Sequence, residues 1–185
     1  MKIYTKTGDK GQTGIIGSRL SKNSTTINAI GNIDELNSLI GIVINKFNNL
    51  QPGKSDFEDS VKTLTQVQNA IFDIGAILAR GKSNRNFLQI TKDLEQQIDL
   101  MEGQLSKLQN FILPGGSEVA SYIHLARSVC RRAERFIVEE ICEEIDESIE
   151  LESTHQDILS FVNRLSDYLF VLARYVNFKL GYEDI

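Results

Sequence analysis

Apolar residues recur at the spacing of amphipathic α-helices along most of the chain, from about residue 33 onward. Outside the first few residues, no run of useful length alternates between apolar and polar positions as a β-strand does. The pattern therefore predicts an all-α protein built as a five-helix bundle. The apolar stripes of the five expected helices begin at Ile33, Val61, Ile90, Val119 and Ile158.

Short polar segments separate the expected helices. Residues 51–55 join the first helix to the second, and residues 81–86 join the second to the third. Connections of this length are typical of antiparallel neighbours, as in the up-down, ferritin-like bundles. The Pro-Gly-Gly sequence at residues 114–116 ends the third helical region, and Ser117 is the expected N-cap of the fourth helix. Because no domain boundary or repeat is visible, residues 1–185 are expected to form one domain.

Composition narrows the class of protein. Hydrophobic residues make up 41% and charged residues 24% of the chain, which is typical of globular domains with a single core. The formal net charge of -5 repels nucleic acid and anionic membrane surfaces, so we expect neither as a partner. The first residues lack the pattern of a signal peptide, and no apolar run is long enough to span a bilayer. We therefore expect a cytoplasmic protein.

The two cysteines do not form an obvious site. Cys130 and Cys142 are twelve positions apart in one expected helix, which separates them by about 18 Å. That distance is too long for a disulfide bond. Neither cysteine has the close spacing to a histidine that marks a zinc site. We expect buried free thiols.

The first candidate for chemistry is the N-terminal loop, residues 5–14. Glycines recur there at every third position among threonines and lysines. Glycine allows close approach of the backbone, threonine hydroxyls and backbone N–H groups donate to phosphate oxygens, and lysine adds charge, so the loop could wrap a phosphate. It has neither the Walker A order nor the Rossmann order of glycines. A glycine-rich arm without a ligand remains an equally open interpretation of the composition.

The second candidate is a row of arginines on the fourth expected helix. Arg127, Arg131 and Arg135 are spaced four residues apart and therefore share one face, with no acidic residue between them at that spacing. Such a row destabilises a helix unless an anion lies across it, and guanidinium groups match phosphate oxygens or a carboxylate. Glu134 could orient Arg131 or hold a magnesium-bound water. A surface cluster that serves solubility is the alternative.

Two further polar segments have more ordinary explanations. Asp34 and Glu35 are expected in the first turn of the first helix, where acidic residues complement the helix dipole. Residues 163–170 place polar side chains within the apolar stripe of the last helix. Polar groups that face a core need partners. This segment could be an internal structural network or the floor of a ligand site, and periodicity does not decide between them.

Together these segments resemble the PduO-type ATP:cob(I)alamin adenosyltransferases, in the same order along nearly the whole chain. The resemblance is carried by residues 4–11, 34–38, 111–116, 124–135 and 163–170. It implies a five-helix bundle that assembles as a homotrimer, with ATP bound between neighbouring subunits through an N-terminal Gly-rich nucleotide-binding loop. The ATP-binding residues that it implies are Thr5, Lys6, Thr7, Gly8, Thr13, Gly14, Lys22, Arg131, Arg132, Glu134, Arg135 and Asn163.

The resemblance also implies a site for the second substrate, cobalamin. Phe111 and Phe170 would face the corrin ring, with Phe111 beneath the cobalt in place of the lower axial base. Asp34 would pair with Arg127 across the subunit interface. Arg131, Phe111, Asp34 and Arg127 are the residues expected to act in catalysis. Protein ligands for the metal ion cannot be assigned from the sequence.

The implied reaction transfers the 5'-deoxyadenosyl group of ATP to the cobalt of cob(I)alamin and releases triphosphate, with Mg²⁺ as the expected cofactor. Cob(I)alamin is itself the nucleophile, so the protein must align the reactants and stabilise the leaving phosphates. A cob(II)alamin reductase and an adenosylcobalamin-dependent enzyme are expected as partners. The alternatives are a cobalamin carrier without activity, for which the N-terminal loop has no purpose, and a different nucleotide-dependent bundle enzyme, which would need a residue that activates water.

Overall fold

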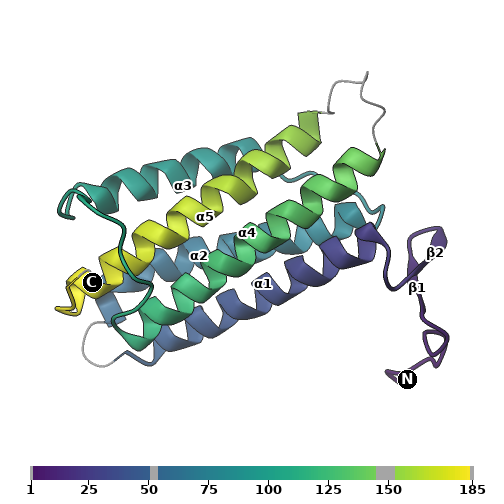
Figure 1. The fold of residues 1–185 in the computed structure, drawn as a ribbon, viewed down its shortest axis with the longest axis horizontal. Coiled ribbons are helices and arrows are strands. Elements are labelled where there is room, and N and C mark those ends of the chain that lie inside the picture. Colours follow the sequence, from purple (N-terminus) through teal and green to yellow (C-terminus); the bar gives the residue numbers. More distant parts are fainter. Residues whose placement is uncertain (1, 51–53, 145–152, 184–185) are drawn as a thin grey trace.

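The computed structural model describes residues 2–50, 54–144 and 153–183. Within them the chain forms a small two-stranded sheet followed by five α-helices (Figure 1). The strands are β1 (Gln12–Ile15) and β2 (Ser18–Ser21), and the helices are α1 (Thr25–Asn48), α2 (Glu58–Leu78), α3 (Phe87–Glu102), α4 (Glu118–Glu144) and α5 (Ser153–Lys179), with a short 3-10 helix at Lys54–Phe57 before α2. The five-helix bundle predicted from periodicity is confirmed.

Successive helices run in opposite directions along an elongated bundle (Figure 1). α5 packs against both α3 and α4, and α1 packs against both α2 and α4. One continuous core of aliphatic and aromatic side chains joins all five helices. An aromatic contact links α3 to this core: the ring centroids of Phe87 in α3 and Phe161 in α5 are 5.8 Å apart. α4 and α5 are therefore the central elements of the fold, and both carry predicted site residues.

A hydrogen-bonded hairpin precedes the bundle, and the sequence did not predict it. β1 and β2 are antiparallel, with Thr13 opposite Leu20 and Ile15 opposite Ser18. Each strand has four residues and alternates only between exposed and half-buried positions, so the hydrophobic signal is weak. The backbone N–H of Ile16 donates to the carbonyl of Ala79 over 3.1 Å, which attaches the hairpin to the end of α2.

The first helix begins earlier than its apolar stripe. Ser24 is the N-cap, and its hydroxyl accepts a hydrogen bond from the backbone N–H of Ile27 over 3.4 Å. The prediction that Asp34 and Glu35 lie in the first turn is therefore wrong, because no acidic residue is in that turn. Both carboxylates lie two turns further along α1, away from the helix N-terminus. The dipole explanation for them does not apply.

The other predicted boundaries agree more closely with the structure. The hydroxyl of Ser117 accepts from the backbone N–H of Ala120 over 3.2 Å, as an N-cap of α4 should. Residues 81–86 lie between α2 and α3, as predicted. Of the connection at residues 51–55, positions 51–53 lie outside the described residues.

The cysteine prediction is half tested. Cys130 is fully buried and free. The side chain of Cys142 lies outside those described. None of the helices described is both long and apolar enough to cross a bilayer.

Candidate functional site

The arginine row predicted on α4 is present as one face of that helix. Arg127 is half-buried, whereas Arg131 and Arg135 are exposed. Arg135 donates from Nη1 to the backbone carbonyl of Arg131 over 2.9 Å, which places the two side chains along the same stripe. Within residues 2–50, 54–144 and 153–183, none of these three arginines forms an ion pair. Three positive charges therefore lie along one face of α4 without an ion pair in the described part of the chain.

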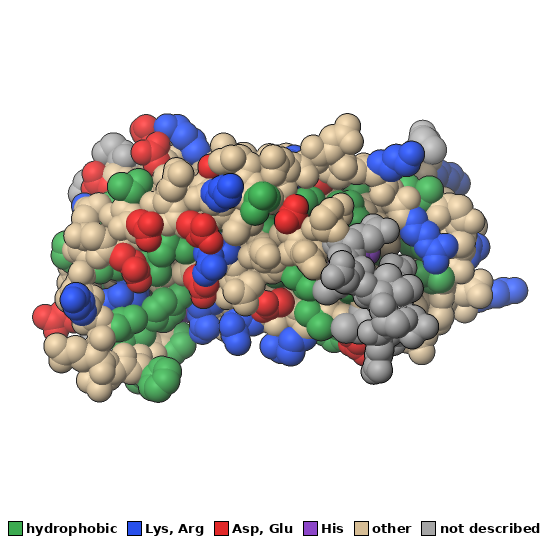
Figure 2. All heavy atoms as spheres, turned by 90° about the horizontal axis from the view of Figure 1, so that it is seen from above, with side chains coloured by type: hydrophobic (Ala, Val, Ile, Leu, Met, Phe, Trp, Pro, Cys, Tyr) green, Lys and Arg blue, Asp and Glu red, His purple; other side chains and the backbone are tan. Residues whose placement is uncertain are grey.

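Three other arginines of the bundle, Arg85, Arg132 and Arg164, each form an ion pair. Arg164 of α5 contacts Glu95 of α3 over 3.0 Å and Asp167 over 2.6 Å. Figure 2 looks down on the bundle from above and shows basic and acidic side chains interspersed on that face. The α4 row thus differs from the ordinary surface of this protein. Because the arginines of the α4 row form no ion pair in the described part of the chain, the row is suited to bind an anion supplied by a ligand or by another chain.

Arg132 has a different environment from its neighbours. Its Nε donates to Oδ1 of Asn32 over 2.6 Å, and its Nη2 forms an ion pair with Glu35. Both partners lie on α1, so Arg132 ties α4 to α1 within one chain. This role of Glu35 was not predicted from the sequence. The arrangement of Arg132 is that of a structural contact, and its expected contact with ATP stays a prediction.

Two predicted ATP residues meet between α4 and α5. Asn163 donates from its side-chain nitrogen to Oε1 of Glu134 over 2.9 Å. Glu134 follows Arg131 by three residues, so the carboxylate is fixed beside the arginine row. The structure therefore joins two motifs that are separated by 29 positions in the sequence.

The predicted cobalamin residues line a single cavity. Phe111, Phe170 and Arg127 border a space of about 730 Å³ at the side of α4 and α5. The rest of its wall comes from the connection between α3 and α4 and from His124, whose ring lies edge-on to Phe170 at 6.2 Å between centroids. His124 is a wall residue that the sequence analysis did not assign. His124 precedes Arg127 by three residues in α4 and so shares its helix face, which is the sequence feature that could have identified it.

Phe111 is not a core residue. Its side chain is completely exposed within the chain, at 106% of the reference area. A second cavity of about 380 Å³ lies next to the first, and the two share Arg127 and Phe170. Arg131 lines the second cavity. An apolar cavity therefore opens beside the unpaired arginines.

The N-terminal loop carries its own concentration of positive charge. Residues 2–24 contain five lysines and arginines and one aspartate, in a protein of net charge -5. Arg19 donates to the backbone carbonyl of Thr7 over 2.7 Å, and the Nζ of Lys22 lies 3.4 Å from the position that a Cβ on Gly8 would occupy. Lys22 is thus brought to the loop as predicted. Arg19 is a basic residue of the loop that the sequence analysis missed.

The backbone of the loop is held in an uncommon conformation. Lys6 has a φ of 60°, which non-glycine residues rarely adopt. The hydroxyls of Thr5 and Thr7 lie 2.8 Å apart and share a hydrogen bond. Backbone of this kind, with hydroxyl and lysine side chains exposed, is common where loops grip ligands.

A single chain does not bring the loop to the arginine row. The N-terminal segment leaves the bundle beyond the end where α1 begins (Figure 1). Among the described residues, no hydrogen bond or ion pair joins residues 2–22 to Arg131, Glu134 or Asn163. Asp34 is exposed on α1 and forms no ion pair with Arg127 in the part of the chain that the structure describes. The predicted site therefore exists as two separate halves.

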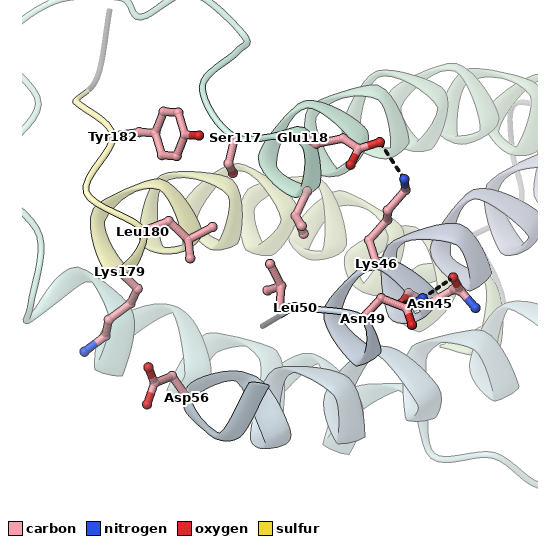
Figure 3. A pocket seen from close by; sticks show the side chains of 11 residues that line it. Asn45, Lys46, Asn49, Leu50, Asp56, Ser117, Glu118, Lys179, Leu180 and Tyr182 are labelled. Atoms are coloured by element: carbon pink, nitrogen blue, oxygen red, sulfur yellow. Dashed lines mark hydrogen bonds and ion pairs between the residues drawn. The ribbon is translucent and has the colours of Figure 1, made fainter. Parts of the chain in front are cut away.

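A larger cavity lies away from both halves. It has a volume of about 780 Å³ and is lined by residues from the end of α1, the start of α4 and the end of α5 (Figure 3). Lys46 and Glu118 form an ion pair of 2.5 Å at its edge. None of the site residues predicted from the sequence lines it.

Comparison with known proteins agrees with the geometry. The corrinoid adenosyltransferase of Bacillus subtilis (strain 168) is 42% identical over 189 residues, covering 100% of this chain and 91% of that protein. The human corrinoid adenosyltransferase MMAB is 37% identical, covering 99% of this chain and 72% of that protein.

Solved structures give the same result. A variant of a PduO-type ATP:corrinoid adenosyltransferase from Lactobacillus reuteri, complexed with cobalamin and ATP, superposes with a TM-score of 0.84 at 39% identity, covering 100% of this chain and 98% of that one. The family model described as cobalamin adenosyltransferase matches residues 3–176. The chain therefore belongs to the cobalamin adenosyltransferase family.

Proposed function

We propose that this protein transfers the 5'-deoxyadenosyl group of ATP to the cobalt of cob(I)alamin, forming adenosylcobalamin and triphosphate. The observation that carries the proposal is the pair of adjoining cavities that share Arg127 and Phe170. The first cavity is bordered by the aromatic rings of Phe111 and Phe170. The second is bordered by Arg127 and Arg131 of the α4 row, together with Arg164 and the carboxylates of Glu102 and Asp167. The corrin ring is largely apolar and the triphosphate of ATP is strongly negative. Aromatic side chains suit the first of these groups, and arginines suit the second.

The nucleotide half of the site consists of Arg131, Arg135, Glu134 and Asn163 on α4 and α5, with residues 5–14 and Lys22 supplied by a neighbouring copy. Two observations support completion across chains. The basic N-terminal loop extends beyond its own bundle (Figure 1), and the arginine row forms no ion pair within residues 2–50, 54–144 and 153–183 of its own chain. A homotrimer would close three such sites, and Asp34 of one copy would neutralise Arg127 of the next.

Arg131 and Arg135 would bind the triphosphate and stabilise the negative charge that develops on it as the C5'–O bond breaks. The electron pair that forms the new Co–C bond comes from cobalt, so no side chain has to remove a proton. The protein's contribution is alignment of cobalt, C5' and the leaving oxygen.

Mg²⁺ fits this site only as a companion of the phosphates. Among the described residues, no three His, Cys, Asp or Glu side chains form a cluster that could hold a metal ion. Mg²⁺ commonly binds through one or two carboxylates together with substrate phosphates. Glu134, fixed by Asn163 beside Arg131, is the carboxylate that would hold it or one of its waters. When bound, the ion would neutralise phosphate charge.

Phe111 and Phe170 would form the corrin half of the site. Phe111, on the exposed rim of the cavity, would occupy the position of the lower axial base. Removal of that ligand makes the cobalt of cob(II)alamin easier to reduce. The electron would come from a separate cob(II)alamin reductase, and the product would pass to an adenosylcobalamin-dependent enzyme.

The test is to incubate the protein with ATP, Mg²⁺ and chemically reduced cob(I)alamin, and to follow the Co–C bond by its visible spectrum and the release of triphosphate. We expect both products in equal amounts. A cobalamin carrier would bind the corrinoid without forming either product. A nucleotide hydrolase would release phosphate or diphosphate without needing cobalamin. Either of these outcomes would refute the proposal.

A further inference from the structure

The connection between α3 and α4, residues 103–117, carries Phe111 but has little structure of its own. Two hydrogen bonds attach its ends to α5, one at Ser106 and one at Gly115. Leu108 and Leu113 are also exposed at 44% and 68%. The position of Phe111 must therefore be set by the points where the two ends of this connection are attached.

Both ends are attached to α5 by buried polar side chains. Arg174 is only 4% exposed, and its Nη2 donates to the backbone carbonyl of Ser106 over 3.0 Å. Asn177 is only 5% exposed and lies one turn further along α5. Its side-chain nitrogen donates to the carbonyl of Gly115 over 2.8 Å. The two residues thus grip the chain on either side of Phe111.

Both the oxygen and the nitrogen of the Asn177 side-chain amide form hydrogen bonds with residues 115–117. Besides the bond to Gly115, its Oδ1 accepts from the backbone N–H of Ser117 over 2.9 Å and from the Ser117 hydroxyl over 3.0 Å. Gly116 lies against it with a φ of 97°, and a Cβ there would come within 2.3 Å of Asn177 Nδ2. The glycine at 116 therefore lets the backbone approach this side chain closely.

The start of α4, which follows Ser117, has a further contact with α1. Glu118, next to Ser117, pairs with Lys46 of α1 over 2.5 Å (Figure 3). The start of α4 is therefore joined to α1 by this ion pair and to α5 by the hydrogen bonds between Ser117 and Asn177. Arg174 and Asn177 line neither of the two cavities that adjoin Arg127. They therefore lie outside the cavity walls and contact the connection at its ends.

We propose that Arg174 and Asn177 are positioning residues that hold residues 106–117 in the arrangement that places Phe111 under the cobalt. This proposal rests on the proposed function, and it adds two residues outside the cavity to the machinery for reduction of cob(II)alamin. Loss of either attachment lets Phe111 leave the cavity. The axial base then returns, and reduction fails while alkylation of cob(I)alamin continues.

The test compares Asn177→Ala, Arg174→Gln, Arg174→Lys and Gly116→Ala with the unaltered protein. Gly116→Ala leaves both buried side chains in place and forces the attachment apart, so it remains informative if the other variants fold poorly. Thr91→Val is the matched control, because Thr91 is a buried polar residue whose hydroxyl donates to the Phe87 carbonyl within α3. Each variant is assayed once from pre-reduced cob(I)alamin and once from cob(II)alamin with a mild reductant.

The ratio of the two activities is the main readout, because it cancels the fraction of folded protein. We expect the rate from cob(II)alamin to fall at least about tenfold relative to the rate from cob(I)alamin in Asn177→Ala and Gly116→Ala, as expected for loss of one or more buried hydrogen bonds. Arg174→Lys should restore part of the ratio lost in Arg174→Gln. An unchanged ratio with an unchanged four-coordinate cob(II)alamin spectrum would overturn the proposal.

A second readout does not depend on the reaction. Lys107 is exposed just after the Ser106 attachment, so trypsin cleavage after Lys107 in the protein without substrates reports how firmly the connection is held. We expect faster cleavage at this site in the attachment variants and no change in Thr91→Val. Equal cleavage in all proteins would refute the anchoring itself. If the wild-type protein fails to alkylate cob(I)alamin while the cleavage rates differ as expected, the proposed function has failed and the anchoring has not.

Discussion

Asn163 of α5 holds the carboxylate of Glu134 of α4 through a hydrogen bond of 2.9 Å. Glu134 is half-buried, and the bond fixes one of its oxygens while leaving the other available. In the proposed site this second oxygen would be the one that meets the nucleotide or its metal ion. The orientation of Glu134 is therefore set by a residue on a different helix.

Replacing Asn163 with leucine removes the donor and should raise the KM for ATP. A hydrogen bond to a charged group contributes about 1.5 to 3 kcal/mol when buried, and partial exposure reduces this to about 1 kcal/mol, or roughly fivefold in KM. Gln89→Leu is the matched control, because it removes a bond of the same length, 2.9 Å, to Asp93 on α3. Equal KM values in the two variants would remove Asn163 from the nucleotide site.

Arg131→Ala should weaken the use of ATP directly. Loss of one charged hydrogen bond to the triphosphate corresponds to about 1.5 to 3 kcal/mol in kcat/KM for ATP. Lys92→Ala, which removes an exposed positive charge from α3, controls for the change in net charge. Steady-state kinetics with cob(I)alamin in excess measure the effect. ATP kinetics in Arg131→Ala that match those of Lys92→Ala would contradict the assignment.

Asp34 and Arg127 are predicted to pair between copies of the chain. Removing one partner of a buried ion pair leaves an uncompensated charge and costs about 3 to 5 kcal/mol. Asp34→Ala and Arg127→Ala should therefore both lower activity and weaken assembly, as measured by light scattering over a dilution series. Asp99→Ala, at an exposed position on α3, is the control. Two fully active variants of unchanged mass would show that the pair does not form.

The helices could be predicted from the sequence because each one presents a long apolar stripe to a common core. Boundaries were harder to place. α1 extends eight residues before Ile33, the first residue of the recognised stripe, since Ser24 caps it and Ala29 is small enough to be buried. Because the predicted start of α1 was too late, Asp34 and Glu35 were assigned to its first turn instead of its interior. The ion pair between Glu35 and Arg132 was therefore not predicted.

Contacts between distant segments could not be predicted from periodicity. Asn177 and Ser117 are 60 positions apart, and only the packing of α5 on the start of α4 brings them together. Asn163 and Glu134 meet for the same reason. The resemblance to a known family named residues of both halves of the site. It could not show that Arg132 is already held by α1, or that Phe111 is exposed rather than part of the core.

The Cys130 thiol gives a prediction for the dependence of stability on pH. Burial raises the pKa of Cys130 above its ordinary value of 9.0, and the nearby carboxylate of Glu134 adds to the rise. The folded protein therefore keeps this proton at a pH where the unfolded chain loses it. The stabilising contribution is complete below pH 9 and is lost above it, at about 1.4 kcal/mol per pH unit.

Urea unfolding of the wild type and of Cys130→Ala at pH 8 and pH 10 tests this expectation. Taking the difference between the two proteins cancels the titration of tyrosines, lysines and Cys142. Cys130→Ala should be less stable at both values of pH, because it leaves a cavity, but its free energy of unfolding should fall less between them. Parallel losses of stability in the two proteins would contradict the prediction.

Phe111→Ala separates a structural role of this ring from a role in reduction. A buried phenylalanine would cost about 3 to 5 kcal/mol of folding stability when truncated. Since the Phe111 side chain is completely exposed within the chain, we expect the free energy of unfolding to change by less than about 0.5 kcal/mol. Thermal and urea unfolding of the variant measure this directly, with Phe161→Ala, in the core between α3 and α5, as the control that should lose stability.

The same variant should lose activity in only one of two assays. If the ring excludes the lower axial base, Phe111→Ala still alkylates pre-reduced cob(I)alamin, because cobalt is then already the nucleophile. Turnover from cob(II)alamin with a mild reductant should fall by much more, since the base returns and the metal resists the electron. The four-coordinate spectrum of cob(II)alamin bound with ATP should fade in parallel. Equal losses in both assays, with that spectrum intact, would show that Phe111 shapes the cavity without displacing the ligand.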